Sequence, residues 1–244
     1  MSEITGINVH IEELRKRVIR SIISILVITV FILTFHATAF DVMGITLYYP
    51  YPEPLNNMAA QFTNIMRGEL VPEGVQLIQT APGQAFFSQV YIAALIGIVV
   101  STPIIVREFI SFLKPALKDR EINVGRSITV PAVGLFIIGC AFSYAAVIPF
   151  ILDFLYRYGE SAGLITFLNI MDFVTFVLQF LLAFGISFQL PLIMYAVSLS
   201  GLVDAKFWRR NLRYAIIAII VFGAVITPDG SGVTMWFVSL PMIA

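Results

Sequence analysis

Long apolar runs separated by short charged segments dominate the sequence. Residues 21–40 carry no formal charge, and further uncharged runs occupy residues 86–106, 127–152 and 173–203. About 20 apolar residues are needed for a helix to cross the hydrocarbon core of a bilayer. With its basic flank included, the first run begins near residue 18. The pattern therefore predicts membrane-spanning helices over about 18–40, 86–106, 127–152 and 173–203.

Two shorter apolar runs follow, at residues 214–228 and 230–244, with Asp229 between them in a Thr-Pro-Asp-Gly-Ser-Gly stretch. Each is 15 residues long, which as an α-helix rises about 22 Å, less than a hydrocarbon core of roughly 30 Å. We therefore predict a short helical hairpin whose external turn, containing Asp229, lies below the outer membrane surface. The second arm reaches residue 244 without a basic anchor, so we expect the last span to be cut short.

The segment between the first two spans, residues 41–83, is polar and rich in turn residues. Its prolines interrupt any long helix in the first half, and we expect Pro54 to shape an external turn. Residues 55–67 are predicted to form a short surface helix. Residues 153–172 form a second external link, and we expect the two external segments to cap the outer side.

Basic residues are distributed unequally across this topology. Of the 15 lysines and arginines, 13 lie at the start of the first span or near the loops at 107–126 and 204–213, and only Arg67 and Arg157 lie elsewhere. Lys and Arg beside membrane spans hold those segments in the cytosol. The bias predicts six spans with both termini cytosolic. We expect one all-α domain, 1–244, shaped as a concave, glove-like bundle.

Composition agrees with an integral membrane protein. The chain is 59% hydrophobic and only 12% charged, whereas about a quarter of residues are charged in a soluble domain. Its zero net charge is segregated along the chain and gives no indication of nucleic-acid binding. The single cysteine, Cys140, excludes an internal disulfide. His10 and His36 lie far apart without a Cys/His cluster, so we expect no metal and no cofactor.

Catalytic signatures are absent from the sequence: there is no P-loop, H-E-x-x-H, G-x-S-x-G or nucleotide fingerprint. The apolar runs also lack ionisable groups, which ion-coupled transporters place within their spans. A small-solute secondary transporter remains the alternative function. An intramembrane enzyme, a third possibility, lacks a nucleophile–base pair.

Gln189, two residues before Pro191, is the polar exception within the spans. Its amide has two interpretations. It bonds a neighbouring helix or the carbonyl freed by Pro191, or it faces the bundle interior and meets an incoming partner helix. Gly185, one turn earlier, is expected to let another helix approach closely.

Carboxylates on the predicted cytosolic segments are the better candidates for function: Glu12, Glu13, Glu108 and Glu121. The first two stand four residues before a basic residue, a spacing at which surface pairing contributes a few tenths of a kcal/mol. On the same predicted helix, Glu12 and Glu13 flank an apolar stripe formed by Ile7, Ile11, Leu14 and Val18. A stripe flanked by acids favours a partner that carries arginines beside an apolar segment.

Four ordered motifs, at residues 10–17, 112–121, 183–191 and 227–229, give the chain a resemblance along essentially its whole length to the TatC family of the twin-arginine protein translocase. Residues 10–17, HIEELRKR, resemble the family's N-terminal H-x-x-E-L-R-x-R. Residues 112–121 resemble F-x-x-P-A-L-x-x-x-E of its first cytosolic loop. Residues 183–191 resemble A-F-G-x-x-F-[EQ]-x-P of its fourth span, with the neutral Gln189 where many relatives have glutamate. Thr-Pro-Asp at 227–229 resembles its fifth-to-sixth turn.

This resemblance implies that Glu13 and Glu121 bind the arginine pair of signal peptides of folded cargo, with Arg15 and Phe112 supporting that site. The planar donors of guanidinium match a carboxylate in a way that lysine cannot reproduce. The resemblance also implies a non-catalytic receptor in the cell membrane that nucleates an export complex driven by the proton-motive force. Its implied partners are TatA- and TatB-like single-span subunits and further copies of the chain.

Overall fold

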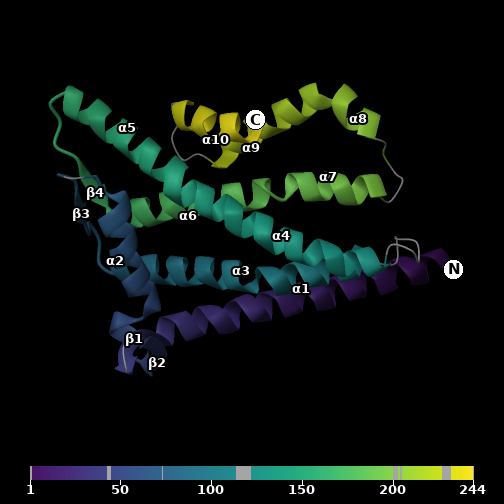
Figure 1. Ribbon diagram of the computed structural model, residues 1–244, viewed down its shortest axis with the longest axis horizontal. Coiled ribbons are helices and arrows are strands. Elements are labelled where there is room, and N and C mark those ends of the chain that lie inside the picture. The colour runs from purple at the N-terminus through teal and green to yellow at the C-terminus, as the bar shows by residue number, and fades with distance from the viewer. Residues whose placement is uncertain are drawn as a thin grey trace.

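Most of the long helices run along the long axis of the molecule, and the helical stretch over residues 122–161 crosses them obliquely (Figure 1). The computed structural model describes residues 2–42, 45–72, 74–113, 122–199, 203, 205–226 and 232–243. The long helical elements are α1 (Ser2–Thr34), α3 (Gln84–Leu113), α4 (Ile122–Phe142), a π-helical turn (Ser143–Val147), α5 (Ile148–Ser161), α6 (Ile170–Ser187) and α7 (Leu190–Leu199). Helix α3 is central, because it packs against α1, α4 and α6.

The C-terminal elements are shorter and lie along one side of this bundle (Figure 1). They are α8 (Ala205–Arg210), α9 (Leu212–Ile226) and α10 (Val233–Ile243). Helices α9 and α10 pack against each other and touch α6. With 15 and 11 residues, they rise about 22 Å and about 16 Å, so both are short, as predicted. The turn with Asp229 lies outside the described residues.

Four helical segments in the described part of the chain are long and apolar enough to cross a membrane: Ile11–Thr34, Gln84–Phe109, Thr129–Ser161 and Ile170–Tyr195. Each overlaps one of the four long spans predicted from the sequence. The prediction of a mostly helical membrane protein is therefore confirmed.

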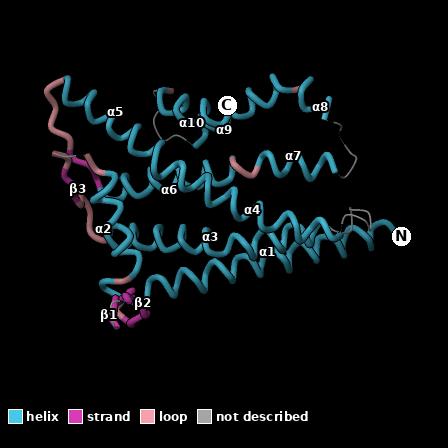
Figure 2. Tube along the Cα trace, viewed as in Figure 1, coloured by secondary structure: helices cyan, strands magenta, loops and turns pink. Residues whose placement is uncertain are grey.

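The first helix ends at Thr34, earlier than the predicted end at residue 40. A β-hairpin follows directly (magenta in Figure 2), in which β1 (Phe35–Val42) pairs antiparallel with β2 (Ile45–Pro52). The aromatic and β-branched residues of both segments favour strands, and pairing satisfies backbone groups that a helix would otherwise bond. Two prolines in β2 are tolerated because a two-stranded hairpin has only edge strands.

A short helix crosses the end of the bundle opposite the N-terminus (Figure 1). The predicted surface helix is observed as α2 (Met58–Leu70), preceded by a 3₁₀ turn, η1 (Pro54–Asn56). Pro54 begins that turn, where its missing N–H breaks no helical bond. The side chain of Asn57 caps α2 by accepting a hydrogen bond from the backbone N–H of Ala60 at 3.0 Å.

The two segments predicted to form a cap do meet at this end. Strand β3 (Gln76–Ile78) pairs in parallel with β4 (Phe167–Asn169). The Asn169 side chain accepts from the N–H of Met171 and donates to the Gln84 carboxamide oxygen at 3.2 Å, linking the starts of α6 and α3. Strand residues 91 positions apart in sequence are thereby paired.

Two predicted spans differ in length or continuity. The third continues to Ser161 rather than 152, because Asp153 and Arg157 stand four residues apart and pair at 2.8 Å without breaking the helix. The π-helical turn lies just before Pro149, which cannot donate a backbone bond. The fourth span breaks between α6 and α7, just before Pro191.

The buried core centres on α6, whose face toward α3 and α4 carries Phe173, Phe180 and Phe184, all fully buried. Helices α4 and α6 approach closely beside them. A Cβ on Gly139 would lie 2.6 Å from the Phe184 carbonyl oxygen, and one on Gly185 would lie 2.7 Å from a ring carbon of Phe136. The close approach predicted at Gly185 is therefore confirmed.

We expect Gly139→Ala to destabilise the protein, because the added methyl group would overlap a backbone carbonyl that cannot swing away. Overpacking of this kind costs about 1–3 kcal/mol. Gly134→Ala is the matched control on the same helix, because nothing lies within 4 Å of a Cβ there; it should be neutral or stabilise by up to about 1 kcal/mol. Thermal unfolding in one detergent would compare them, and equal melting temperatures would contradict the packing.

Candidate functional site

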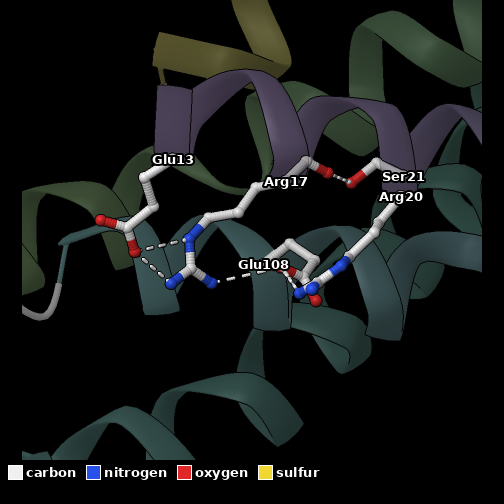
Figure 3. Close-up of polar contacts among 5 residues, drawn as sticks. All are labelled: Glu13, Arg17, Arg20, Ser21 and Glu108. Carbon is white, nitrogen blue, oxygen red and sulfur yellow. Dashed lines mark hydrogen bonds and ion pairs between the residues drawn. The ribbon is translucent and has the colours of Figure 1, made fainter. Parts of the chain in front are cut away.

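Two carboxylates and two guanidinium groups meet near the N-terminal end of the bundle (Figure 3): Glu13, Arg17 and Arg20 on α1, and Glu108 on α3. The α1 residues are four and three positions apart, so they share one helix face. Helix α3 runs antiparallel to α1, which brings its last turns beside the first turns of α1 (Figure 1).

Local packing fixes this register. The Ser24 hydroxyl donates to the Ser101 hydroxyl at 2.9 Å, about two turns from the cluster. Further along, Gly97 lets α1 approach, since a Cβ there would lie 3.0 Å from the Ile25 carbonyl oxygen and 2.6 Å from the Thr29 hydroxyl. Small and hydroxylated side chains of this kind allow close contact between helices in membranes.

Arg17 bridges the two carboxylates. Its Nε donates to Glu13 Oε1 at 3.1 Å, and its Nη2 contacts the same oxygen. Its Nη1 donates to Glu108 Oε2 at 3.2 Å. Arg20 Nη1 lies 3.7 Å from that same Glu108 oxygen. One guanidinium therefore joins α1 to α3 across 91 residues of sequence.

Burial separates this cluster from ordinary surface pairing. The side chains of Arg17 and Glu108 are only 20% and 13% exposed, and that of Glu13 is 34% exposed. The neighbouring pair of Glu12 and Lys16 is 3.6 Å apart and about two-thirds exposed. An exposed pair contributes at most about 1 kcal/mol, whereas charges shielded from water interact more strongly. The cluster is thus the strongest electrostatic feature at this end of the described chain.

The predicted signal-peptide residues fall partly within this cluster. Glu13 belongs to it, and Arg15 lies exposed two residues further along α1. Phe112 lies in the last turn of α3, one turn beyond Glu108, so both share that helix face. Glu121 lies outside the described residues. Their convergence on one binding site stays a prediction.

The sequence placed Glu108 among the candidate carboxylates and Arg17 four residues after Glu13. It did not predict that Arg17 pairs with Glu108 on another helix. A signal was present, because Glu108 lies two residues after the uncharged run 86–106, and a carboxylate shielded from water needs a charged partner. Which basic residue would supply that partner depends on the packing of α1 against α3.

Gln189 lies at the break between α6 and α7 and donates from Nε2 to the Ala132 carbonyl oxygen of α4, at 3.0 Å. This is the neighbouring-helix bond of the first interpretation. A contact of Gln189 with an incoming partner helix stays a prediction. Within the described residues, no group of three or more His, Cys, Asp or Glu side chains is placed to hold a metal ion.

Comparison with known proteins decides the family. The family model for Sec-independent protein translocase protein (TatC) matches residues 9–241. The chain belongs to the TatC family. It is 67% identical to TatC of Cenarchaeum symbiosum (strain A), over 96% of this chain and 89% of that protein. It is 28% identical to TatC of Aquifex aeolicus, over 96% and 88% respectively.

A solved structure agrees with the TatC assignment. The crystal structure of a twin-arginine translocase receptor TatC matches with a TM-score of 0.77 at 26% identity, covering 96% of this chain and 93% of that one. The resemblance seen in the four sequence motifs is confirmed. The chain is therefore a translocase receptor subunit of the membrane, in a family concerned with protein transport rather than catalysis, and the small-solute transporter is not favoured.

We expect Gln189→Glu to make stability depend on pH. Only a protonated carboxyl group can donate to the Ala132 carbonyl, so the loss relative to the parent should be small in acid and should grow as rising pH ionises the acid. Gln189→Leu should lose about 1 kcal/mol at every pH. Melting temperatures across a pH series would test this; a constant difference between the Glu variant and the parent would contradict it.

Proposed function

We propose that this chain captures twin-arginine signal peptides of folded cargo at its cytosolic face and nucleates assembly of the export complex, with the proton-motive force as the energy source. The observation that carries the proposal is the placement of Glu13. Its carboxylate lies in the HIEELRKR motif, partly open to solvent, and already accepts two N–H groups from one guanidinium.

Such a site suits arginine for geometric reasons. A guanidinium presents parallel N–H donors in a fixed plane, whereas an ammonium is a compact point charge. The Nε and Nη2 groups of Arg17 both contact Glu13 Oε1, so this carboxylate already accepts hydrogen bonds from a guanidinium on the side facing α3. We assign the second carboxylate of the site to Glu121. It follows Phe112 in the loop after α3, and we assign the Phe112 ring to the apolar part of the peptide.

Arg15 is assigned a supporting role because it occupies the first arginine position of the motif H-x-x-E-L-R-x-R. Its exposed side chain points from a different helix face than Glu13, since residues two apart do not face the same way. It would therefore contact the peptide or the following loop rather than pair with Glu13.

We further propose a six-span topology with both termini cytosolic, in which α9 and α10 supply the last two crossings of a concave bundle. Helix α9 exposes an apolar row at four-residue spacing: Ile217, Val221 and Val225. In a bilayer this row faces lipid or another apolar helix. We assign such outer faces to TatA- and TatB-like single-span subunits and to further copies of the chain, with Gln189 adding a polar contact.

The carboxylate at Glu13 should be essential for capture. Glu13→Gln keeps the shape but removes the charge, and a hydrogen bond to a charged group is worth about 1.5–3 kcal/mol, so peptide affinity should fall at least about tenfold. Glu121→Gln should have a similar effect. The measurement is the binding of a labelled twin-arginine peptide to purified protein in lipid nanodiscs.

Glu12→Gln is the matched control, because Glu12 is the adjacent, more exposed carboxylate on the same helix. It should change the affinity by less than about twofold, since exposed pairs contribute little. Parent-like binding by the Glu13 variant, or equal losses in the two variants, would show that the site lies elsewhere.

A further inference from the structure

We propose that Arg17 is a resident occupant of the arginine site. It holds Glu13 in the resting protein and transfers to Glu108 when an arginine of a signal peptide takes its place. This inference rests on the proposed role of Glu13 in signal-peptide capture. It adds a competitor, Arg17, and a positioning residue, Glu108, to that site.

The first argument is the occupancy of Glu13. Two of the N–H groups of Arg17 converge on one oxygen of Glu13 and so occupy the side of the carboxylate where Arg17 lies (Figure 3). A guest arginine cannot form the same bonds while Arg17 holds them. Peptide binding on this face of Glu13 must therefore displace the resident side chain.

The second argument is that Arg17 already contacts a second carboxylate, that of Glu108. Its Nη1 donates to Glu108 at 3.2 Å while Nε and Nη2 contact Glu13. Loss of the Glu13 bonds would leave this contact in place, so a change of side-chain rotamer is sufficient and the backbone can stay where it is. The guanidinium then moves from a shared position onto one carboxylate.

The third argument concerns charge. The four groups of the cluster balance: two carboxylates face two guanidinium groups. If Glu108 were neutral, displacement would leave Arg17, which is largely shielded from water, without a carboxylate partner among these residues. An uncompensated charge in such surroundings is costly. Glu108 lowers the cost of displacement and so supports capture without touching the peptide.

This exchange would also set specificity. To displace Arg17, a peptide side chain must offer a planar pair of N–H donors as well as a positive charge. Arginine offers such a pair and lysine does not. A peptide with paired arginines can displace Arg17 and engage a second carboxylate together. Removal of the resident should therefore strengthen binding and at the same time weaken the discrimination between arginine and lysine.

The test is a double-mutant cycle on purified protein in nanodiscs, with labelled signal peptides carrying either paired arginines or paired lysines. Arg17→Gln should bind the arginine peptide about fivefold to tenfold more tightly and should reduce the preference for it over the lysine peptide. Glu108→Gln should bind the arginine peptide about tenfold more weakly. The double variant should match Arg17→Gln, because Glu108 supports capture through Arg17, and its 3.7 Å contact with the largely exposed Arg20 contributes little.

Lys16→Gln is the matched control, because it removes the same charge from the neighbouring exposed position; its affinity should stay within about twofold of the parent. Arg17→Lys keeps the positive charge but lacks the planar pair of N–H donors, so it should also strengthen peptide binding. This variant replaces Arg17→Gln in the assay if Arg17→Gln does not insert into the membrane. Weaker binding in these Arg17 variants, or a Glu108 effect that persists without Arg17, would overturn the inference.

Glu13→Gln in the same assay separates the two proposals. If Glu13→Gln leaves the peptide affinity unchanged, the proposed capture site is wrong, and the proposed transfer of Arg17 from Glu13 to Glu108 is rejected as well. If it weakens capture while Arg17→Gln weakens capture as well, the site stands and only the resident role of Arg17 is rejected.

Discussion

The contact between α1 and α3 is the one on which the candidate site depends, because its charged groups come from both helices. Glu13 and Arg17 need Glu108 at a fixed height on the opposite helix, and that height follows from the hydroxyl pair and the glycine contact further along the interface. A shift of one residue along either helix would move the carboxylate by about 1.5 Å and rotate it about 100° away. Arg17, which is largely shielded from water, would then lose its second partner.

The opposite end of the bundle provides an independent anchor for the same pair of helices. The backbone N–H of Glu53 donates to the Thr34 carbonyl oxygen at 3.0 Å, so the chain returns to the end of α1 after the hairpin. Helix α2 then packs across α1 and α3. This arrangement closes the end where unpaired carbonyl groups would otherwise remain, and it leaves the N-terminal end of α1 as the region where ion pairs fix the geometry.

Features encoded locally in the sequence could be predicted, and features that depend on distant packing could not. Uncharged runs predicted the four long helices. The break beside Gln189 was not predicted, although Pro191 lies next to it. The hairpin after Thr34 was missed because residues 35–40 are apolar enough to read as membrane helix. The pairing of Arg17 with Glu108 was missed because spacing arguments see only neighbours within one helix, and these residues are 91 positions apart.

Photo-crosslinking would test the central claim most directly: signal-peptide arginines bind where α1 meets the end of α3. Probes would replace Leu14 and Phe109, which are exposed beside the cluster, and Tyr48 and Leu164, which are exposed toward the other end of the molecule. A twin-arginine peptide should form adducts at the first two positions only, and these should disappear when its arginines are changed to lysine. Equal labelling at Tyr48, or adducts that persist with the lysine peptide, would contradict the account.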